Sequence, residues 1–299
     1  MKNLTVVIVT FSTDKDLLIK CVNSISKKSK ILIIENSKNF IHKKFFLDNY
    51  SNIEIFCTNK NLGYGGGNNF GLKKVKTDFA LILNPDVTLD KDFFFNIKDV
   101  VKNNNFSLIG CQNIYEKIFM PAGYFKKNKD INFRKQFKYL KRNNLIKVDW
   151  ITGCSMLMNM NDFKQKEVFD RNFFLYFEEI DLCMKLKKLK KDVFLSRKLK
   201  IHHLGFKSSS FQNLDFHNEA KKLRSWHWMW SFFYYHKKNY GYFVALTKSL
   251  GKLFKSFFKS IFYSIIFDQV NRDKYLYRFL GLFCSILGLS SFYRGKYFK

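Results

Sequence analysis

The sequence predicts an α/β fold in which a mostly parallel sheet is flanked by helices and followed by a helical, amphipathic C-terminal extension. Apolar strand-like runs alternate with segments of helical spacing up to Asp90, and the first run, Leu4–Phe11, is apolar on both faces, as parallel strands are. From Glu219 onward the chain is aromatic and basic with helical spacing. The chain has 299 residues, 46% of them hydrophobic, which is enough to bury a full core.

The predicted elements of the first part follow one another in strict alternation. Short runs rich in Val, Ile and Leu predict strands at Leu4–Phe11, Ile31–Ile34, Ile53–Cys57 and Phe79–Leu83. Apolar residues at helical spacing predict helices at Asp14–Ser26, Lys43–Asn49 and Tyr64–Lys76. Such alternation is typical of a parallel sheet with helices on both faces.

The pattern is looser after Asp90. Lys126–Lys147 is polar and basic without a clear period and predicts a loop. Phe173–Lys191 begins extended and turns helical, and Val193–Leu195 resembles a strand. The segment from Glu219 to the C-terminus is predicted to be helical.

Charge and cysteine content limit the possible partners and the compartment. The net charge of +29 favours an anionic partner, which could be a nucleic acid, a membrane surface or a phosphate-bearing substrate. The six cysteines form no CxxC pair, which argues against a zinc site or a disulfide framework and favours reduced thiols in the cytoplasm. The run Leu4–Phe11 is short and β-branched, so we expect a buried strand there and no signal peptide.

Polar residues follow each of the four predicted strands. They are Thr10-Phe11-Ser12, Glu35-Asn36-Ser37, Asn59 to Gly63, and Asn84-Pro85-Asp86. Ligands of parallel α/β sheets bind beyond the carboxyl ends of the strands. Asp86 is a lone carboxylate after a proline turn, and Mg²⁺ or Mn²⁺ binds to one or two carboxylates together with phosphate oxygens. The alternative is a turn that only caps the strand.

The segment Gly63–Gly71 is glycine-rich and begins a predicted helix. Its backbone N–H groups could approach an anion at the helix N-terminus. The alternative is tight packing of the helix. Its spacing and position differ from those of a dinucleotide fingerprint, and it does not end in the Lys-Ser/Thr pair of a Walker loop.

Three carboxylates and two histidines complete the candidate residues. Glu178, Glu179 and Asp181 begin an amphipathic helix after a run of aromatic residues, whose burial would raise a carboxylate pKa and suit a general base. The alternative is ordinary capping at the helix N-terminus. His202 and His203 follow the strand-like segment and are candidate metal ligands or acid/base groups, although such a pair is often structural.

These residues together resemble the family-2 inverting glycosyltransferases of the GT-A (Rossmann-like) fold. Within that family they are most similar to the rhamnosyltransferase-like branch that builds bacterial surface polysaccharides. The similar stretches are collinear over the first two thirds of the chain: Val6–Phe11, Glu35–Ser37, Asn61–Gly71, Leu83–Val87, Gly153–Met156, Phe174–Cys183 and His203–Ser208.

The resemblance implies a role for each candidate residue. Residues expected to bind the nucleotide-sugar are Thr10, Phe11, Glu35, Asn61, Gly63, Asn69, Asn84 and Asp86. Asp86 would hold a divalent cation, Mn²⁺ or Mg²⁺, with His203, or alternatively His202, as a second ligand or diphosphate contact. The catalytic carboxylates would be Glu179 as the base, Glu178 as its neighbour and Asp181 as an alternative base. Gly153 and Cys154 would shape the acceptor side.

The sequence departs from the family at three positions. Glu179 stands where the base is normally Asp, Glu35 also replaces Asp, and Ser12 replaces Asn. The longer Glu179 side chain moves its carboxylate by about one methylene, which keeps Asp181 open as the base. The departures also leave an alternative function, a non-catalytic scaffold in a polysaccharide assembly complex.

The resemblance also implies domains, partners and location. Residues 1–218 would form the catalytic domain, with a nucleotide-sugar half at about 1–100 and an acceptor half at about 101–218, followed by a helical region at 219–299. The donor would be a nucleotide-diphosphate sugar, with dTDP-rhamnose as the candidate, and the acceptor a saccharide or a lipid-linked saccharide.

Tyr240–Lys299 predicts amphipathic helices on an anionic membrane, or alternatively a helical cap on the catalytic domain. The expected location is therefore the cytoplasm, peripheral on the inner face of the cell membrane. Basic residues are spread along the chain without a recognised binding module, so we expect no nucleic acid partner. A nucleotidyltransferase is a further alternative, although Thr10–Lys15 offers only a weak phosphate-binding motif.

Overall fold

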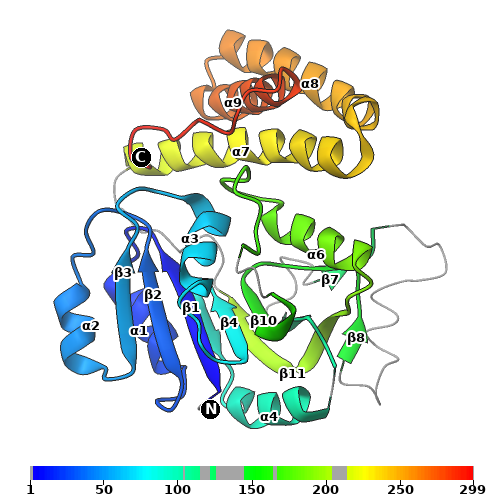
Figure 1. Ribbon diagram of the computed structural model, residues 1–299. Helices are drawn as coiled ribbons and strands as arrows, with labels where there is room; N and C mark the ends of the chain where they lie inside the picture. Colours follow the sequence, from blue (N-terminus) through cyan, green and yellow to red (C-terminus); the bar gives the residue numbers. More distant parts are fainter. Residues whose placement is uncertain are drawn as a thin grey trace. The chain divides into compact units, whose positions relative to one another are not determined.

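A computed structural model describes residues 3–103, 105–114, 122–125, 145–163, 167–203 and 214–298 (Figure 1). The chain divides into two compact units. The first comprises Met1–Asn59, Gly67–Val168 and Leu182–Ser210, and the second comprises Lys60–Gly66, Phe169–Asp181 and Phe211–Lys299. The predicted boundary after residue 218 stays a prediction.

The first unit contains the sheet. Its parallel part has the order β3-β2-β1-β4 and consists of β1 (Leu4–Thr10), β2 (Lys30–Glu35), β3 (Ile53–Cys57) and β4 (Phe79–Leu83). All four were predicted: β1, β2 and β4 are largely buried and leave apolar runs in the sequence, and β3 at the end of the sheet is recognised by its alternating Ile53, Ile55 and Cys57.

The sheet continues beyond β4 with mixed strand directions. The order is β4-β10-β6-β11-β5, formed by β10 (Ser155–Asn159), β6 (Leu108–Asn113), β11 (Val193–His203) and β5 (Val87–Leu89). β10 is antiparallel to β4 and β6, β11 is parallel to β6, and β8 (Leu145–Lys147) pairs with β11. A separate small ladder joins β7 (Ala122–Gly123) to β9 (Trp150–Ile151). The predicted fold class is confirmed.

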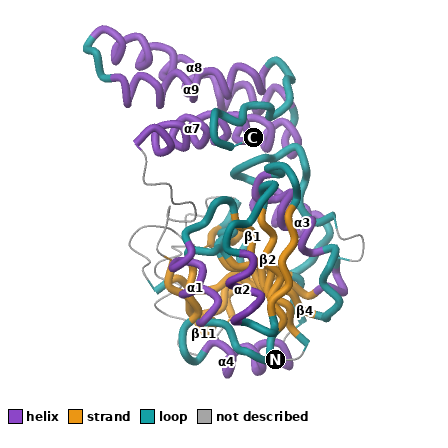
Figure 2. Tube along the Cα trace, turned by 90° about the vertical axis from the view of Figure 1, so that its left-hand side faces the viewer, coloured by secondary structure: helices purple, strands orange, loops and turns teal. Residues whose placement is uncertain are grey.

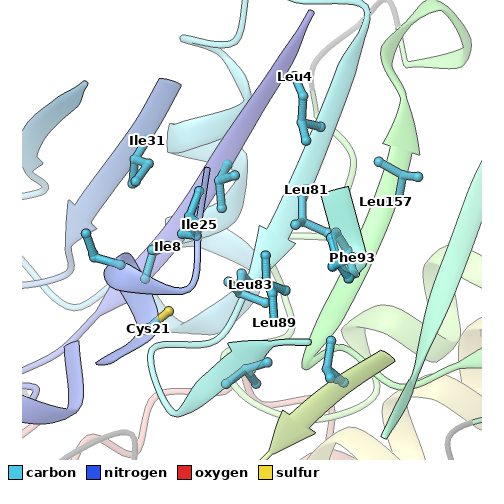
Figure 3. Packing of buried hydrophobic residues seen from close by; sticks show 14 of the residues in the cluster. Leu4, Ile8, Cys21, Ile25, Ile31, Leu81, Leu83, Leu89, Phe93 and Leu157 are labelled. Carbon is cyan, nitrogen blue, oxygen red and sulfur yellow. The ribbon is translucent and has the colours of Figure 1, made fainter. Parts of the chain in front are cut away.

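Helices cover both faces of the sheet. One cluster of buried residues joins α1 (Lys15–Asn23), α2 (Lys43–Asn49) and α4 (Phe93–Asn103) to one face of the strands, and Figure 3 shows Cys21, Ile25 and Phe93 of this layer against Ile8, Leu81 and Leu157. Asp14 caps α1 by accepting the Leu17 N–H at 2.9 Å.

The other face carries α3 (Gly63–Leu72). A Cβ at Gly67 would lie 2.7 Å from the Val9 side chain, and one at Gly71 would lie 2.5 Å from that of Val7. These glycines therefore let the helix backbone approach β1 closely, which favours the packing interpretation of the glycine-rich segment. The remaining elements of this part of the chain are η1 (Met160–Asp162) and α6 (Glu178–Lys188).

The second unit is mainly helical. α7 (Leu214–Tyr240), α8 (Tyr242–Ile265) and α9 (Gln269–Ile286) lie side by side (Figures 1 and 2). A Cβ at Gly281 of α9 would lie 2.2 Å from the Trp226 carbonyl oxygen of α7, so only glycine permits this approach. Within the described ranges, none of the helices combines the length and the apolar character needed to cross a membrane.

After α9 the chain returns along α7. The Trp230 indole donates to the Leu289 carbonyl at 2.9 Å, and the His227 ring nitrogen Nε2 lies 2.7 Å from the Tyr293 carbonyl. The helical C-terminal region was predicted, whereas this returning segment was not.

The loop predicted at Lys126–Lys147 lies outside the described residues up to position 144. Its last three residues form β8, so the loop prediction was wrong for them. β8 is only three residues long and gains its hydrogen bonds from β11, which a local sequence pattern does not reveal.

Candidate active site

The polar ends of the parallel strands meet at one edge of the first unit. β1 and β2 pair in a register that places Thr10 beside Glu35. The Glu35 carboxylate accepts hydrogen bonds from the Thr10 hydroxyl at 2.7 Å and the Ser12 N–H at 3.3 Å. Glu35 is buried, and these donors hold its carboxyl group in place at the carboxyl ends of β1 and β2. Phe11, which lies between Thr10 and Ser12 in the sequence, is half-buried.

Asp86 and His203 meet at the same edge. β11 runs antiparallel to β5 with His203 opposite Val87, which places His203 next to Asp86. The His203 Nε2 atom lies 3.4 Å from the Asp86 Oδ1 atom, and Asp86 is only 2% exposed. Successive side chains of a strand point to opposite faces. Accordingly His202 lies near another carboxylate, with 3.8 Å between its Nε2 and Asp90 Oδ2.

The ionisation of His203 follows from these neighbours. Burial lowers the pKa of His203, but contact with Asp86 and with the Cys154 sulfur outweighs burial and raises it to about 10. The pair is therefore an imidazolium–carboxylate ion pair near neutral pH. A metal that used His203 as a ligand would have to displace this proton, because only the neutral imidazole binds a metal.

The Asp86–His203 pair fits a divalent cation. A carboxylate oxygen and an imidazole nitrogen are both ligands of Mn²⁺, and 3.4 Å between them allows adjacent positions on one ion at about 2.1–2.2 Å from each. In the part of the chain that the structure describes, no set of three or more His, Cys, Asp or Glu side chains is placed to hold a metal. Asp86 and His203 would thus leave the other coordination positions of the ion to other ligands.

Asn84 and Cys154 lie beside this pair. The Asn84 N–H donates to the Cys154 carbonyl at 2.9 Å, and the Cys21 thiol lies 3.6 Å from the Asn84 carbonyl. Gly153 and Cys154 lie directly before β10, which begins at Ser155. Asn69 is buried on α3, and its side-chain oxygen accepts the Val168 N–H at 3.0 Å.

Asn61 and Gly63 belong to the second unit. The Asn61 amide accepts the Gly63 N–H at 3.0 Å and donates to the Phe298 carbonyl at 3.1 Å. Gly63 has a φ of +76°, and a Cβ there would lie 2.1 Å from the Phe174 carbonyl oxygen, so this position requires glycine. The Tyr64 N–H donates to that same carbonyl at 3.0 Å. The N–H groups of Gly63 and Tyr64, the first two residues of α3, are thus hydrogen-bonded within the protein.

The segment before Glu178, residues 173–177, is strained and firmly held, and we call it the base loop. Tyr176 and Phe177 have positive φ angles of 71° and 69°, which costs about 1–3 kcal/mol for each such residue. The Phe177 ring packs against Trp228 and Tyr235 of α7. Strain of this kind persists only where the surroundings enforce it, and α7 supplies those surroundings.

A hydrogen bond also fixes the base loop to α7. The Ser231 hydroxyl donates to the Leu175 carbonyl at 2.9 Å, and Ser231 is fully buried. This hydrogen bond restrains the backbone at Leu175, directly before the strained residues Tyr176 and Phe177.

Glu178 and Glu179 follow the base loop at the start of α6. Glu178 is 3% exposed, and burial together with the charge of Glu179 raises its pKa well above the ordinary range. Among the described residues its Oε2 atom has no hydrogen-bond partner. Burial raises the pKa of Glu179 to about 7, against the opposing effect of backbone N–H groups at the helix start. Burial therefore favours the neutral form of Glu178, and the pKa of Glu179 lies near 7.

Asp181 is held in an ion-pair network that we call the Lys238 clamp, formed by Asp170, Asp181 and Lys238. The Lys238 ammonium lies 2.6 Å from Asp181 and 2.7 Å from Asp170, and the Asn239 amide donates to Asp181 at 3.0 Å. The clamp ties the first turn of α6 to the end of α7. An engaged carboxylate of this kind suits a positioning role better than proton transfer.

The residues of α7 that hold the base loop carry no recognisable signal in the sequence. Ser231, Lys238 and Asn239 are ordinary helix residues in the sequence, and they lie more than fifty positions from the groups they contact. The predicted roles of all candidate residues stay predictions, although the geometry brings His203 rather than His202 to Asp86.

Comparison with known proteins shows the family to which the chain is related. The model of the family described as Glycosyl transferase family 2 matches residues 5–165, more than half of the chain. The low-salt glycan biosynthesis hexosyltransferase Agl10 of Haloferax volcanii is 24% identical over 197 residues, which are 63% of this chain and 62% of that protein. The rhamnosyltransferase WbbL of Escherichia coli K12 is 23% identical over 187 residues, 56% of this chain and 70% of that protein.

Solved structures share the fold. The crystal structure of GalNAc-T7 with UDP, GalNAc and Mn²⁺ superposes with a TM-score of 0.56 at 14% identity, covering 68% of this chain and 44% of that one. The chain thus spans 62% of the length of Agl10 and less than half of GalNAc-T7.

Proposed function

The chain belongs to glycosyl transferase family 2, and from this premise we propose that it transfers a sugar from a nucleotide-sugar to a saccharide or lipid-linked acceptor. The proposed role is in the synthesis of a cell-surface glycan. The names of its relatives, a glycan biosynthesis hexosyltransferase and a rhamnosyltransferase, support this role.

The observation that carries the proposal is the carboxylate pair Glu178 and Glu179. A general base works best when its pKa lies near the working pH, and burial raises the pKa of Glu179 to about 7. Burial raises the pKa of Glu178 beside it, which disfavours a second negative charge next to Glu179. Glu178 is buried and Glu179 partly buried behind a strained loop, a placement that helix capping alone would not require.

The proposed reaction is a single displacement. Glu179 accepts the proton of the acceptor hydroxyl while that oxygen forms a bond to the anomeric carbon of the donor sugar. The bond from this carbon to the diphosphate oxygen breaks on the opposite face, so the nucleoside diphosphate leaves and the anomeric configuration inverts. Proton transfer to a positioned base contributes about 10²–10⁴-fold in rate.

Asp86 and His203 are proposed to hold a divalent cation, Mn²⁺ or Mg²⁺. When bound, the cation would supply positive charge that stabilises the departing diphosphate. The Mn²⁺ in the structure of GalNAc-T7, which shares the fold, supports this choice of cation. Phosphate oxygens of the donor would take coordination positions that the protein leaves open.

Calorimetry tests the cation assignment. The Asp86→Ala variant should bind nucleoside diphosphate at least tenfold more weakly than wild type in Mn²⁺, with little difference in EDTA, because it removes the buried carboxylate. Asp90→Ala, beside His202, is the matched control and should behave as wild type. Equal affinity of the Asp86 variant and wild type in Mn²⁺ would reject the assignment.

The proposed donor is dTDP-rhamnose, on the basis of similarity to a rhamnosyltransferase. A panel of nucleotide-sugars incubated with the protein and Mn²⁺ tests both donor and function. We expect one nucleotide-sugar to be hydrolysed slowly, and to be consumed faster with a saccharide acceptor, with an inverted anomeric configuration by NMR. Failure of the whole panel to react, with or without acceptors, would contradict the proposed function.

The proposed place of action is the cytoplasmic side of the cell membrane, where the protein would be peripheral. A lipid-linked acceptor would be presented at that surface. The basic composition, with a net charge of +29, favours contact with anionic lipids.

A further inference from the structure

Helix α8 turns its small side chains inward. Its buried residues are Ala245, Ser249, Ser256 and Ser260, which fall on one stripe of the helix. This stripe faces α7 and α9, the two helices that α8 contacts. A helix on the surface of a water-soluble domain normally buries its large apolar side chains and exposes small or polar ones. α8 has the opposite arrangement.

Most of the large apolar side chains of α8 are exposed, whereas Leu246 and Leu253 are partly buried against α7 and α9. The Phe257 ring also contacts Phe279 of α9 along one side. Phe254 is 56% exposed, Phe258 62% and Ile265 69%. Together with other exposed apolar residues at spacings of three and four, they form what we call the outer stripe: Phe243, Leu250, Phe254, Phe257, Phe258, Ile261 and Ile265. Scattered apolar residues are normal at a surface, but a continuous stripe indicates an apolar partner.

The turn after α8 extends the outer stripe. Phe267 is 90% exposed and has a φ of 56°, a conformation that is unfavourable for a bulky residue. Ile266 and Val270 beside it are also exposed. The turn thus presents its largest side chain to the surroundings of the protein at a cost in backbone strain.

Cations accompany the outer stripe. Lys248, Lys252, Lys255 and Lys259 recur at helical spacing and form a lysine column on an adjacent face of α8, and the helix sequence contains no Asp or Glu. At the turn end, the Tyr275 ring is contacted by Lys259 at 5.0 Å and by Arg278 of α9 at 5.6 Å. Clustered positive charges beside exposed apolar side chains call for a partner that is both anionic and apolar.

We propose that α8 and the turn after it lie in the interface of an anionic lipid membrane, with the outer stripe among the acyl chains and the lysine column at the headgroups. A helix with one apolar face and one cationic face suits this position. A second copy of the chain is a poorer occupant, because pairing two outer stripes would bring two lysine columns together. This surface rests on the proposed function, since it would bring the protein to a lipid-linked acceptor.

The expected contribution of each lysine is measurable. A lysine near an anionic membrane surface contributes about 1 kcal/mol, which is about fivefold in partitioning at low salt. The Lys252→Gln/Lys255→Gln variant should therefore bind anionic vesicles about 20–30-fold more weakly than wild type. The matched control is Lys27→Gln/Lys28→Gln, which removes the same charge from an exposed loop of the first unit.

Co-sedimentation of the full chain with phosphatidylcholine vesicles, with and without phosphatidylglycerol, tests the surface. Wild type should pellet with the anionic vesicles and less with neutral ones. Phe254→Ser/Phe258→Ser/Ile265→Ser should lose at least tenfold in binding and keep its thermal unfolding midpoint, because these side chains are exposed. Phe95→Ser, which changes a phenylalanine on α4 that is 80% exposed, should bind as wild type.

Two outcomes would overturn the inference. One is equal vesicle binding by the triple variant and the Phe95 control. The other is that wild type is a dimer in sedimentation equilibrium and does not bind vesicles, whereas the triple variant is a monomer. This result would assign the outer stripe to contact with a second copy of the chain. Donor hydrolysis measured on the same variants separates the two proposals, because it should be unchanged by substitutions in α8. A wild type that binds vesicles but turns over no nucleotide-sugar would reject the proposed function alone.

Discussion

We expect α7 to position the catalytic carboxylates through the Lys238 clamp. Lys238→Met removes the ammonium that lies 2.6 Å from Asp181 and 2.7 Å from Asp170 while keeping most of the side-chain volume. Asp181 then retains the Asn239 amide and loses its charged partner. Because Asp181 is in the first turn of α6, the loss should loosen the turn that carries Glu179.

The magnitude follows from the burial of the two partners. Breaking a buried ion pair costs about 3–5 kcal/mol, and an exposed pair contributes about 0–1 kcal/mol. The Asp181 side chain is 6% exposed and that of Lys238 37%, so the clamp lies between these limits. We expect the free energy of unfolding to fall by about 2 kcal/mol. A shift of about 1 Å in a reacting group costs about 10²-fold in rate, so kcat should fall between tenfold and a hundredfold.

Urea unfolding and steady-state kinetics with the donor identified by the panel measure both effects. Lys237→Met is the matched control, since Lys237 is the neighbouring exposed lysine and lies over the Tyr242 ring at 5.9 Å. Donor affinity should be unchanged in both variants, so the loss should appear in kcat. If Lys238→Met and Lys237→Met have the same stability and the same kcat, the positioning argument is wrong.

Two other predictions concern pH and packing. The value of kcat at saturating donor should rise with pH and reach half its maximum near pH 7, because Glu179 can accept a proton only after losing its own. A kcat that is constant from about pH 5.5 to about pH 8.5 would contradict the assignment of Glu179 as the base. Gly281→Ala should lower the free energy of unfolding by about 1–3 kcal/mol, since its Cβ would meet the Trp226 carbonyl, whereas Gly251→Ala in the open interior of α8 should raise it by about 0.5–1 kcal/mol. Denaturant unfolding of the two alanine variants checks the contrast, and equal changes would refute the close approach of α9 to α7.

The parallel half of the sheet could be predicted from the sequence because its signals are local. The predicted bounds of α2, β3 and β4 agree with the structure residue for residue. A strand buried on both faces leaves an uninterrupted apolar run, and its end is marked by the first polar residues. The approach of Asp86 to the Thr10–Glu35 edge could be anticipated in the same way, because all these strands end at one side of the sheet.

The other features of the fold and the site depend on strand pairings and helix contacts between distant residues, which no local sequence pattern encodes. β10 lies between β4 and β6 although it follows both in the chain, and the choice of His203 over His202 at Asp86 depends on the register of β11 against β5. The sequence showed that α8 is amphipathic but not that its serine stripe faces inward, because that depends on α7 and α9. The Lys238 clamp joins residues 57 positions apart for the same reason.

The most direct test of the central claim is the Glu179→Gln variant, assayed for sugar transfer and, by calorimetry, for donor binding. Glutamine keeps the size of the side chain but cannot accept the acceptor proton. We expect kcat to fall by about 10²–10⁴-fold while the Kd for the donor stays within about twofold of wild type. Turnover near the wild-type level would contradict the assignment of Glu179 as the base and move that role to Glu178 or Asp181.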